Sequence, residues 1–257
     1  MRIVIKIGTS TLTHKTGELN IRRTEELCKI ISDIKNSGVE IIIVSSGAIG
    51  MGTAKLSLSE RPHDIATKQA AAAVGQCELM YRYDRLFAEY HHTVAQILLT
   101  GSDFHSEDRH TNFSNTICKL LELNVIPVIN ENDTIATDEI KVGDNDTLSA
   151  LVSVSVSADQ LILLSDIDGL FTADPHKNPD AKLINTITEI NDDVMALAGD
   201  SSSELGTGGM KTKLQAAKIC LEGGCDMVIA NGSNPHILYD IVSGSTADCT
   251  RFLSKRC

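Results

Sequence analysis

The chain has 257 residues, of which 42% are hydrophobic and 22% charged, a composition typical of a folded globular protein and not of a disordered one. Its formal net charge of -11 would repel a phosphate backbone, so nucleic acid is not expected as the main ligand. No apolar run is long enough to cross a membrane and no signal peptide precedes the first strand, which predicts a cytoplasmic protein.

Strand-like and helix-like segments alternate through almost the whole chain. The strands are apolar on both faces, as in EIIIVSS and DQLILLS, which is typical of a parallel sheet covered by helices on both sides. The sequence therefore predicts the α/β class with a mainly parallel central sheet. The predicted strands are 2–7, 39–45, 93–99, 125–129, 160–164 and 227–230. The predicted helices are 22–36, 64–90, 112–123, 146–156 and 211–221.

Seven cysteines are spread along the chain without a CxxC pair, and their odd number does not favour a disulfide framework. Cys220 and Cys225 flank a Gly-Gly turn, where a metal site and ordinary thiols are the alternatives. Because a zinc site needs a second pair of ligands that the sequence lacks, we prefer ordinary thiols.

Residues suited to chemistry follow five of the predicted strands. In an open parallel sheet, ligands bind beyond the C-terminal ends of the strands, so these segments are expected to share one edge. They are KIGTS at 6–10, SSGAIG at 45–50, NEND at 130–133, SDIDGLFTADP at 165–175 and ANGS at 230–233.

Three lysines occupy positions where a cation costs stability unless it is paired or serves a ligand. Lys6 lies at the tip of a buried strand. Lys211 and Lys213 fall in the first turn of a helix behind Gly208 and Gly209, where the helix dipole disfavours a cation. Neither a P-loop nor a GxGxxG fingerprint is present, so the glycine turns alone do not identify a nucleotide site.

Carboxylates and amides gather at two places, NEND at 130–133 and DND at 144–146. Asp144 or Asp146 could cap the helix that follows, but one cap does not need all three residues of DND. Together the clusters could bind an ammonium group, hold the lysines in place or contact magnesium. This inventory favours phosphoryl transfer, whose catalysis is mainly positioning and charge stabilisation.

In the order of its motifs, nearly the whole chain resembles the glutamate 5-kinases of the amino acid kinase superfamily. The matching segments are KIGTS, VSSGAIGMG, VINENDTIATDEIKVGDNDTLSA, LLSDIDGLFTADP and LGTGGMKTKLQAA. Kinases for aspartate, N-acetylglutamate, carbamate or UMP share the sheet and the leading lysine, but they lack the combination of NEND with VGDND.

The resemblance implies a three-layer α/β/α sandwich that is one domain over 1–257. About 1–155 would bind glutamate and about 156–257 would bind ATP. The implied reaction moves the γ-phosphoryl group of MgATP to the side-chain carboxylate of L-glutamate. Its product is L-glutamyl 5-phosphate, the first intermediate of proline biosynthesis.

The resemblance also implies roles for single residues, with no metal ligand assigned. Lys6 and Lys213 would be catalytic, oriented by Asp146, while Gly8 and Gly47 would let backbone N–H groups reach the moving phosphoryl group. The glutamate positions are Ser46, Gly47, Asn130, Asp133, Asp144 and Asn145. The ATP positions are Lys6, Gly8, Ser165, Asp166, Thr207, Gly208, Gly209, Met210, Lys211, Thr212 and Lys213.

Two departures from the family pattern are visible. Many members have Thr where this chain has Ser165, and a hydroxyl is kept. Many bacterial members continue into a C-terminal domain of the type found in RNA-modifying enzymes, so this chain is expected to be a short form.

The expected partners are L-glutamate and MgATP in a homo-oligomer, a dimer or a tetramer. Proline as a feedback inhibitor and a reductase that consumes the acyl phosphate are further expectations. Two alternatives stay open: a kinase for another small carboxylate or phosphate, and a non-catalytic sensor. A sensor would be expected to lack Lys6, Asp146 or Lys213, and all three are present.

Overall fold

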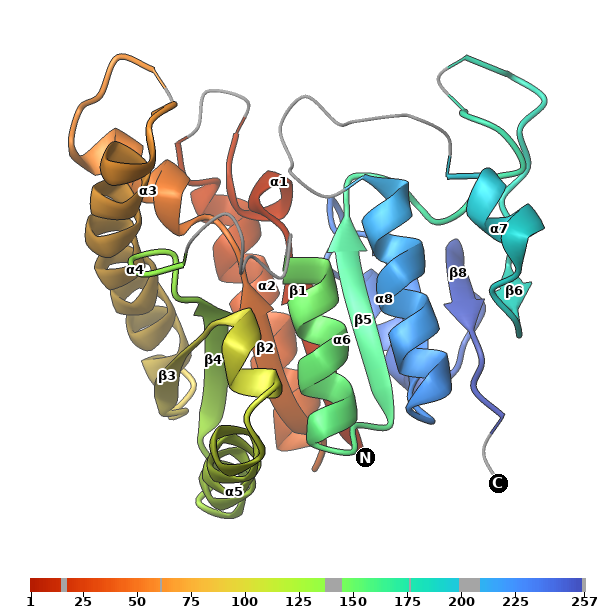
Figure 1. The fold of residues 1–257 in the computed structure, drawn as a ribbon. Helices are drawn as coiled ribbons and strands as arrows, with labels where there is room; N and C mark the ends of the chain where they lie inside the picture. The colour runs from red at the N-terminus through yellow and green to blue at the C-terminus, as the bar shows by residue number, and fades with distance from the viewer. Residues whose placement is uncertain (15–17, 61, 137–144, 176, 199–208, 256–257) are drawn as a thin grey trace.

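The apolar runs of the sequence build one central eight-stranded sheet (Figure 1). The computed structural model describes residues 1–14, 18–60, 62–136, 145–175, 177–198 and 209–255. The strands are β1 (Arg2–Ile7), β2 (Glu40–Ser45), β3 (Val94–Leu99), β4 (Ile126–Glu131), β5 (Gln160–Ser165), β6 (Thr186–Ile187), β7 (Asp226–Asn231) and β8 (Cys249–Phe252).

The strand order is β3-β4-β2-β1-β5-β7-β8-β6, which places β1 in the interior between β2 and β5. Neighbouring strands run parallel, except that β8 pairs antiparallel with β7. In this register Lys6 lies beside Val44 on one side and Leu163 on the other. The C-terminal ends of β1, β2, β4, β5 and β7 therefore share one edge, as the sequence predicts.

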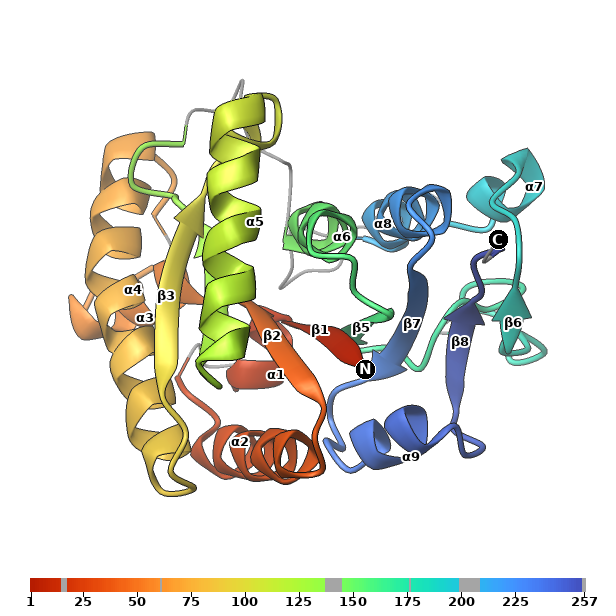
Figure 2. The ribbon, with the colours of Figure 1, turned by 90° about the horizontal axis from the view of Figure 1, so that it is seen from below.

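Helices cover both faces of the sheet (Figure 2). One face carries α5 (Glu107–Glu122), α6 (Asn145–Ser155) and α8 (Met210–Glu222), and the other carries α2 (Ile21–Asn36), α4 (Ile65–Ala88) and α9 (Ile237–Ser243). Residues along β1 alternate between the two cores, with Val4 in the first and Ile3 and Ile5 in the second. The predicted three-layer α/β/α sandwich is thus confirmed.

Short or polar elements were not predicted. The helix expected at 112–123 begins earlier, at Glu107. Its first turn is acidic and has no apolar periodicity, so the sequence pattern does not reveal where the helix starts. β8 has four residues and is held by pairing with β7, so its sequence gives no strand signal of its own. The other additions are α1 (Thr9–Leu12), α3 (Ala48–Lys55), the 3₁₀ helix η1 (Gly101–Phe104), α7 (Asp192–Ala196), α9 and β6.

Cys220 and Cys225 are buried, not joined by a disulfide, and lie on either side of the turn between α8 and β7. Within the described ranges, no helix combines the length and the apolar composition needed to cross a bilayer.

Two glycines let α3 and α4 pack backbone against backbone. A Cβ atom on Gly52 would lie 1.8 Å from the carbonyl oxygen of Ala71, and one on Gly75 would lie 1.7 Å from that of Ala48. Real Cβ atoms do not approach backbone so closely, so both positions require glycine. This contact fixes α4 against the start of α3, which directly follows the end of β2.

We expect Gly52→Ala to lower the free energy of unfolding by about 2 kcal/mol or more, because the added methyl group must push the two helices apart. Gly50→Ala is the matched control on the same helix, because nothing lies within 4 Å of a Cβ atom there. The control should be neutral or gain up to about 1 kcal/mol from helix propensity. Urea denaturation measures both, and equal effects would contradict the packing argument.

Candidate active site

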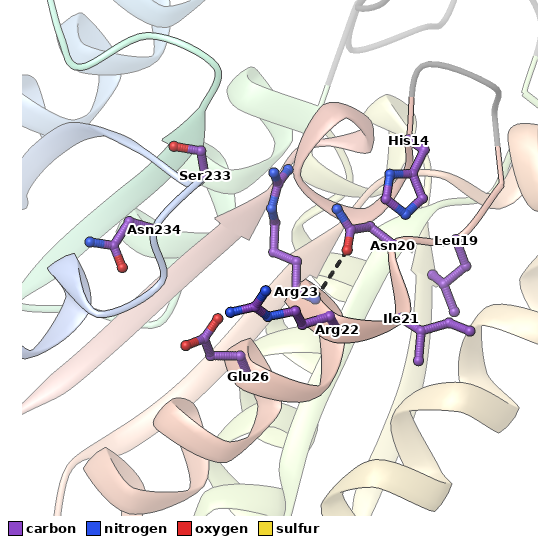
Figure 3. A pocket seen from close by; sticks show the side chains of 9 residues that line it. All are labelled: His14, Leu19, Asn20, Ile21, Arg22, Arg23, Glu26, Ser233 and Asn234. Atoms are coloured by element: carbon purple, nitrogen blue, oxygen red, sulfur yellow. Dashed lines mark hydrogen bonds between the residues drawn. The ribbon is translucent and has the colours of Figure 1, made fainter.

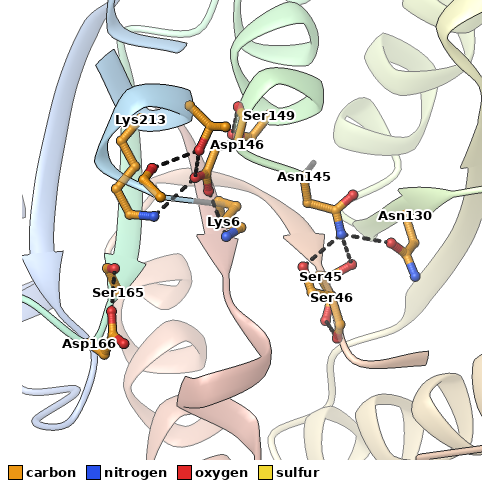
Figure 4. A network of polar contacts seen from close by, with 12 residues as sticks. Lys6, Ser45, Ser46, Asn130, Asn145, Asp146, Ser149, Ser165, Asp166 and Lys213 are labelled. Atoms are coloured by element: carbon orange, nitrogen blue, oxygen red, sulfur yellow. Dashed lines mark hydrogen bonds and ion pairs between the residues drawn. The ribbon is translucent and has the colours of Figure 1, made fainter. Parts of the chain in front are cut away.

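A buried aspartate between two lysines lies at the C-terminal edge of the sheet (Figure 4). Lys6 Nζ is 2.6 Å from Asp146 Oδ1, and Lys213 Nζ is 3.1 Å from Asp146 Oδ2. The Asp146 side chain is 1% exposed, while those of Lys6 and Lys213 are 12% and 8% exposed. Residues from the beginning, middle and end of the chain thus form one cluster, which we call the lysine cluster.

Each member of the lysine cluster comes from the end of a different element. Lys6 stands near the end of β1, Asp146 in the first turn of α6 and Lys213 in the first turn of α8. Thr212 Oγ1 also lies 3.1 Å from Asp146 Oδ2 and 2.8 Å from the carbonyl oxygen of Gly209. Asp146 pairs with both lysines, which is consistent with the alternative in which the DND segment holds the lysines in place.

The charge state of Asp146 follows from its surroundings. Burial alone would raise the pKa of this carboxyl group, but the ammonium groups of Lys6 and Lys213 outweigh burial and hold the pKa below its ordinary value of 3.8. Asp146 is therefore ionised at neutral pH. Within the lysine cluster itself, two ammonium groups face one carboxylate, and ammonium groups are suited to contact an anion.

Glycines precede the helices that begin beside the lysine cluster. Gly209 is the N-cap of α8, and Gly47, with φ at +104°, is the N-cap of α3. A Cβ atom on Gly8 would lie 3.6 Å from Lys6 Nζ and 3.4 Å from the carbonyl oxygen of Leu164. The N-cap residue of the 13-residue α8 makes no side-chain cap hydrogen bond. The first backbone N–H groups of a helix favour a phosphate.

An amide cluster adjoins the lysine cluster, because Asn145 is the neighbour of Asp146 at the start of α6. Asn145 Nδ2 lies 3.0 Å from the carbonyl oxygen of Ser45, 2.7 Å from Ser46 Oγ and 2.9 Å from Asn130 Oδ1. Figure 4 shows these contacts on one side of the lysine cluster and Ser165 with Asp166 on the other.

Ser165 ends β5, and its hydroxyl donates a hydrogen bond to Asp166 Oδ1 at 3.1 Å. β1, which carries Lys6, lies between β5 and β2 in the sheet. The lysine cluster therefore divides this edge of the sheet into a β5 side and a side formed by β2 and β4. Two ligands bound on opposite sides would both contact the lysines.

The remaining predicted residues lie near the same edge or outside the described part of the chain. Asp133 is half-buried in the turn after β4, Met210 packs partly buried against the core, and Lys211 is exposed. The predicted residues outside the described ranges are Asp144, Thr207 and Gly208.

A layer of polar side chains on α4 lies behind the amide cluster and is not evident from the sequence. Gln76 Oε1 accepts a hydrogen bond from Asn130 Nδ2 at 2.9 Å, and the hydroxyls of Tyr83 and Ser45 are 2.9 Å apart. Burial raises the pKa of Tyr83, so its hydroxyl stays protonated. The only signal in the sequence is a glutamine inside the apolar run AAAAVGQ.

A separate pocket of about 650 Å³ lies between the start of α2 and the turn after β7 (Figure 3). It contains none of the residues predicted to bind glutamate or ATP, although Ser233 of the ANGS segment lines it. Its lining residues are His14, Leu19, Asn20, Ile21, Arg22, Arg23, Glu26, Ser233 and Asn234.

The sheet and the lysine cluster define a kinase that acts on a small molecule, and comparison with known proteins agrees. The chain belongs to the amino acid kinase family, whose model matches residues 1–231. The glutamate 5-kinase of Clostridium perfringens is 51% identical to it over 259 aligned positions, which cover 99% of this chain and 96% of that protein. The glutamate 5-kinase of Caldanaerobacter subterraneus is 52% identical over 97% of this chain and 67% of its own length.

Solved structures of low sequence identity share the fold. An isopentenyl phosphate kinase superposes with a TM-score of 0.68 at 19% identity, covering 98% of this chain and all of that one. The carbamate kinase of Giardia lamblia, bound to AMP-PNP, gives a TM-score of 0.69 at 16% identity, covering 99% of this chain and 98% of that one.

We expect Asp146→Asn to lower the free energy of unfolding by about 3 kcal/mol at pH 7, because it leaves the buried ammonium group of Lys213 and the largely buried one of Lys6 without their carboxylate. Since the pKa of Asp146 is depressed by folding, its stabilising effect is full above about pH 4 and is lost as the pH falls through the folded-state pKa. The difference between variant and wild type should therefore shrink below about pH 4.

Urea denaturation at a series of pH values measures this difference. Asp166→Asn, at an exposed aspartate, is the control and should change the free energy by less than about 0.5 kcal/mol. A variant as stable as the wild type at pH 7 would contradict the proposed ion cluster.

Proposed function

We propose that this protein transfers the γ-phosphoryl group of ATP to the side-chain carboxylate of L-glutamate, forming L-glutamyl 5-phosphate for proline biosynthesis. The observation that carries the proposal is the lysine cluster, Lys6–Asp146–Lys213, beside a cluster of amides at one sheet edge. The proposal is supported by curated relatives named glutamate 5-kinase at about half identity over nearly the whole chain.

The reaction forms a bond between a carboxylate oxygen of glutamate and the γ-phosphorus, and it breaks the bond from that phosphorus to the oxygen of ADP. A glutamate side chain is already ionised at neutral pH, so the nucleophile needs no general base. Negative charge on the moving group is what the enzyme must stabilise. Lys6 and Lys213 serve this purpose, and Asp146 holds both without taking a proton itself.

Glutamate is proposed to lie on the β2 and β4 side of the lysine cluster. Ser46, Asn130 and Asn145 form the hydrogen-bonded group there, and Asp133 in the next turn supplies negative charge for the α-ammonium group. Gly47 gives backbone access at the start of α3. A role for Asp144 in glutamate binding stays a prediction.

ATP is proposed to lie on the β5 and β7 side. Ser165 ends β5 there and Asp166 follows it. The phosphates would approach the backbone at Gly8 and at Gly209, where α8 begins. Met210, Lys211 and Thr212 belong to the same turn, and nucleotide binding by Thr207 and Gly208 stays a prediction.

Magnesium would be supplied with the nucleotide and would neutralise negative charge on its phosphates. Such ions keep several waters and take only one or two carboxylates from a protein. In the described part of the chain, no group of three or more His, Cys, Asp or Glu residues is placed to hold a metal by itself.

Several finer expectations stay predictions. They are the division into a glutamate part at about 1–155 and an ATP part at about 156–257, the dimer or tetramer, inhibition by proline, transfer of the product to a reductase, and the cytoplasmic location.

With MgATP and hydroxylamine, we expect a hydroxamate from L-glutamate and none from N-acetyl-L-glutamate or L-aspartate. Hydroxylamine traps the acyl phosphate, so the assay reports the product directly. A second series with proline tests feedback inhibition. Product from N-acetyl-L-glutamate would favour a kinase for another carboxylate, and a folded protein that binds ATP but gives no product would favour a sensor.

We expect Lys213→Ala to lower kcat at least about 100-fold, a loss of about 3 kcal/mol of transition-state stabilisation. Lys213 is buried against Asp146, whereas Lys218 on the same helix is exposed. Lys218→Ala is therefore the matched control and should keep the wild-type kcat. An equally active Lys213→Ala enzyme would exclude the proposed role of this lysine.

A further inference from the structure

Gln76 is a buried amide on α4 that lies one contact behind the amide cluster. Its exposed fraction is 7%, and its Oε1 atom accepts a hydrogen bond from Asn130 Nδ2 at 2.9 Å. Asn130 is 2% exposed, so water cannot easily replace that acceptor. Gln76 therefore satisfies a polar group that the site itself contains.

The orientation of the Asn130 amide is fixed from its oxygen side. Asn130 Oδ1 accepts hydrogen bonds from the backbone N–H of Glu131 and from Asn145 Nδ2, both at 2.9 Å. A backbone N–H can only donate, so Oδ1 stays on that side and Nδ2 faces Gln76. Gln76 must therefore present Oε1 to Asn130, because a reversed Gln76 amide would place its NH₂ group against the NH₂ group of Asn130.

The nitrogen of Gln76 indicates that this residue is not selected by packing alone. Nε2 is buried and has no hydrogen-bond partner in the described part of the chain. A buried donor without an acceptor destabilises a fold, so stability alone would favour an apolar side chain of similar size. What the residue supplies is the oxygen that Asn130 needs.

The effect of this contact reaches Asn145. Asn145 Nδ2 donates hydrogen bonds to oxygens of three residues, Ser45, Ser46 and Asn130. Among the described residues, none donates a hydrogen bond to Asn145 Oδ1, which leaves that oxygen for a ligand. The Asn145 NH₂ group has two hydrogens, which these three oxygens share. If Asn130 turned away, the amide would lose the acceptor on the β4 side and would no longer be oriented from that strand.

We propose that Gln76 is a positioning residue for the amino-acid substrate, an inference that rests on the proposed function. It holds Asn130, and through Asn130 the Asn145 amide, so that the carbonyl oxygen of Asn145 is available to the α-ammonium group of glutamate. The backbone contact of Gly75 with Ala48 fixes α4 at this point, so Gln76 cannot follow a displaced partner.

The test compares Gln76→Met, which removes the acceptor at similar volume, with Gln76→Glu, which keeps an acceptor for Asn130. In Gln76→Met we expect the KM for glutamate to rise about tenfold or more, with the KM for ATP within about twofold of wild type. In Gln76→Glu the KM for glutamate should stay within about threefold. Thermal unfolding of both variants checks that the fold is kept.

A Gln76→Met enzyme with the wild-type KM for glutamate would overturn the inference, as would one in which both KM values rise together. If Gln76→Met does not fold, Gln76→Asn replaces it. The side chain of this variant is too short to reach Asn130, so we expect the same rise in the KM for glutamate. The wild type separates the two hypotheses: if it forms no hydroxamate from L-glutamate, the proposed function fails and the inference with it. An active wild type limits the failure to Gln76.

Discussion

The active site depends on one buried carboxylate shared by two lysines. Asp146 ties the end of β1 to the starts of α6 and α8, and its side chain is 1% exposed. Desolvating three charges costs about as much as their attraction returns, so such a cluster is a poor source of stability. Its value is geometric: it holds two ammonium groups at fixed positions before any ligand binds.

The sheet order explains why two reactants can meet at this cluster. β1 lies between β2 and β5, so the groups that follow β2 and β4 lie to one side of Lys6 and those that follow β5 and β7 to the other. Asn145 and Asp146 are neighbours on α6, which joins the amide cluster to the lysine cluster. An acceptor held by the amides and a nucleotide held near β5 would therefore both reach the lysines.

The sequence was sufficient for the parts of this arrangement that depend on single residues in their local context. A lysine at a buried strand tip and another in a first helical turn already require an anion or a partner, and Lys6 and Lys213 share one in Asp146. Apolar runs likewise located six of the strands. β6 and β8 were missed because pairing with neighbours holds them, and pairing is a tertiary property.

The polar layer on α4 could not be predicted from the sequence either, because its contacts with β2 and β4 are also a tertiary property. Gln76 and Tyr83 stand two turns apart on one face of α4, inside a segment whose periodicity reports burial but not partners. Their partners, Asn130 and Ser45, come from β4 and β2. That meeting depends on α4 touching α3 at Gly52 and Gly75, where bare backbone contacts bare backbone. Glycine lowers the helix propensity of α3 and α4, but here it allows the close contact that brings the polar layer on α4 next to the amide cluster. The geometry of the site therefore depends on helix packing outside the site.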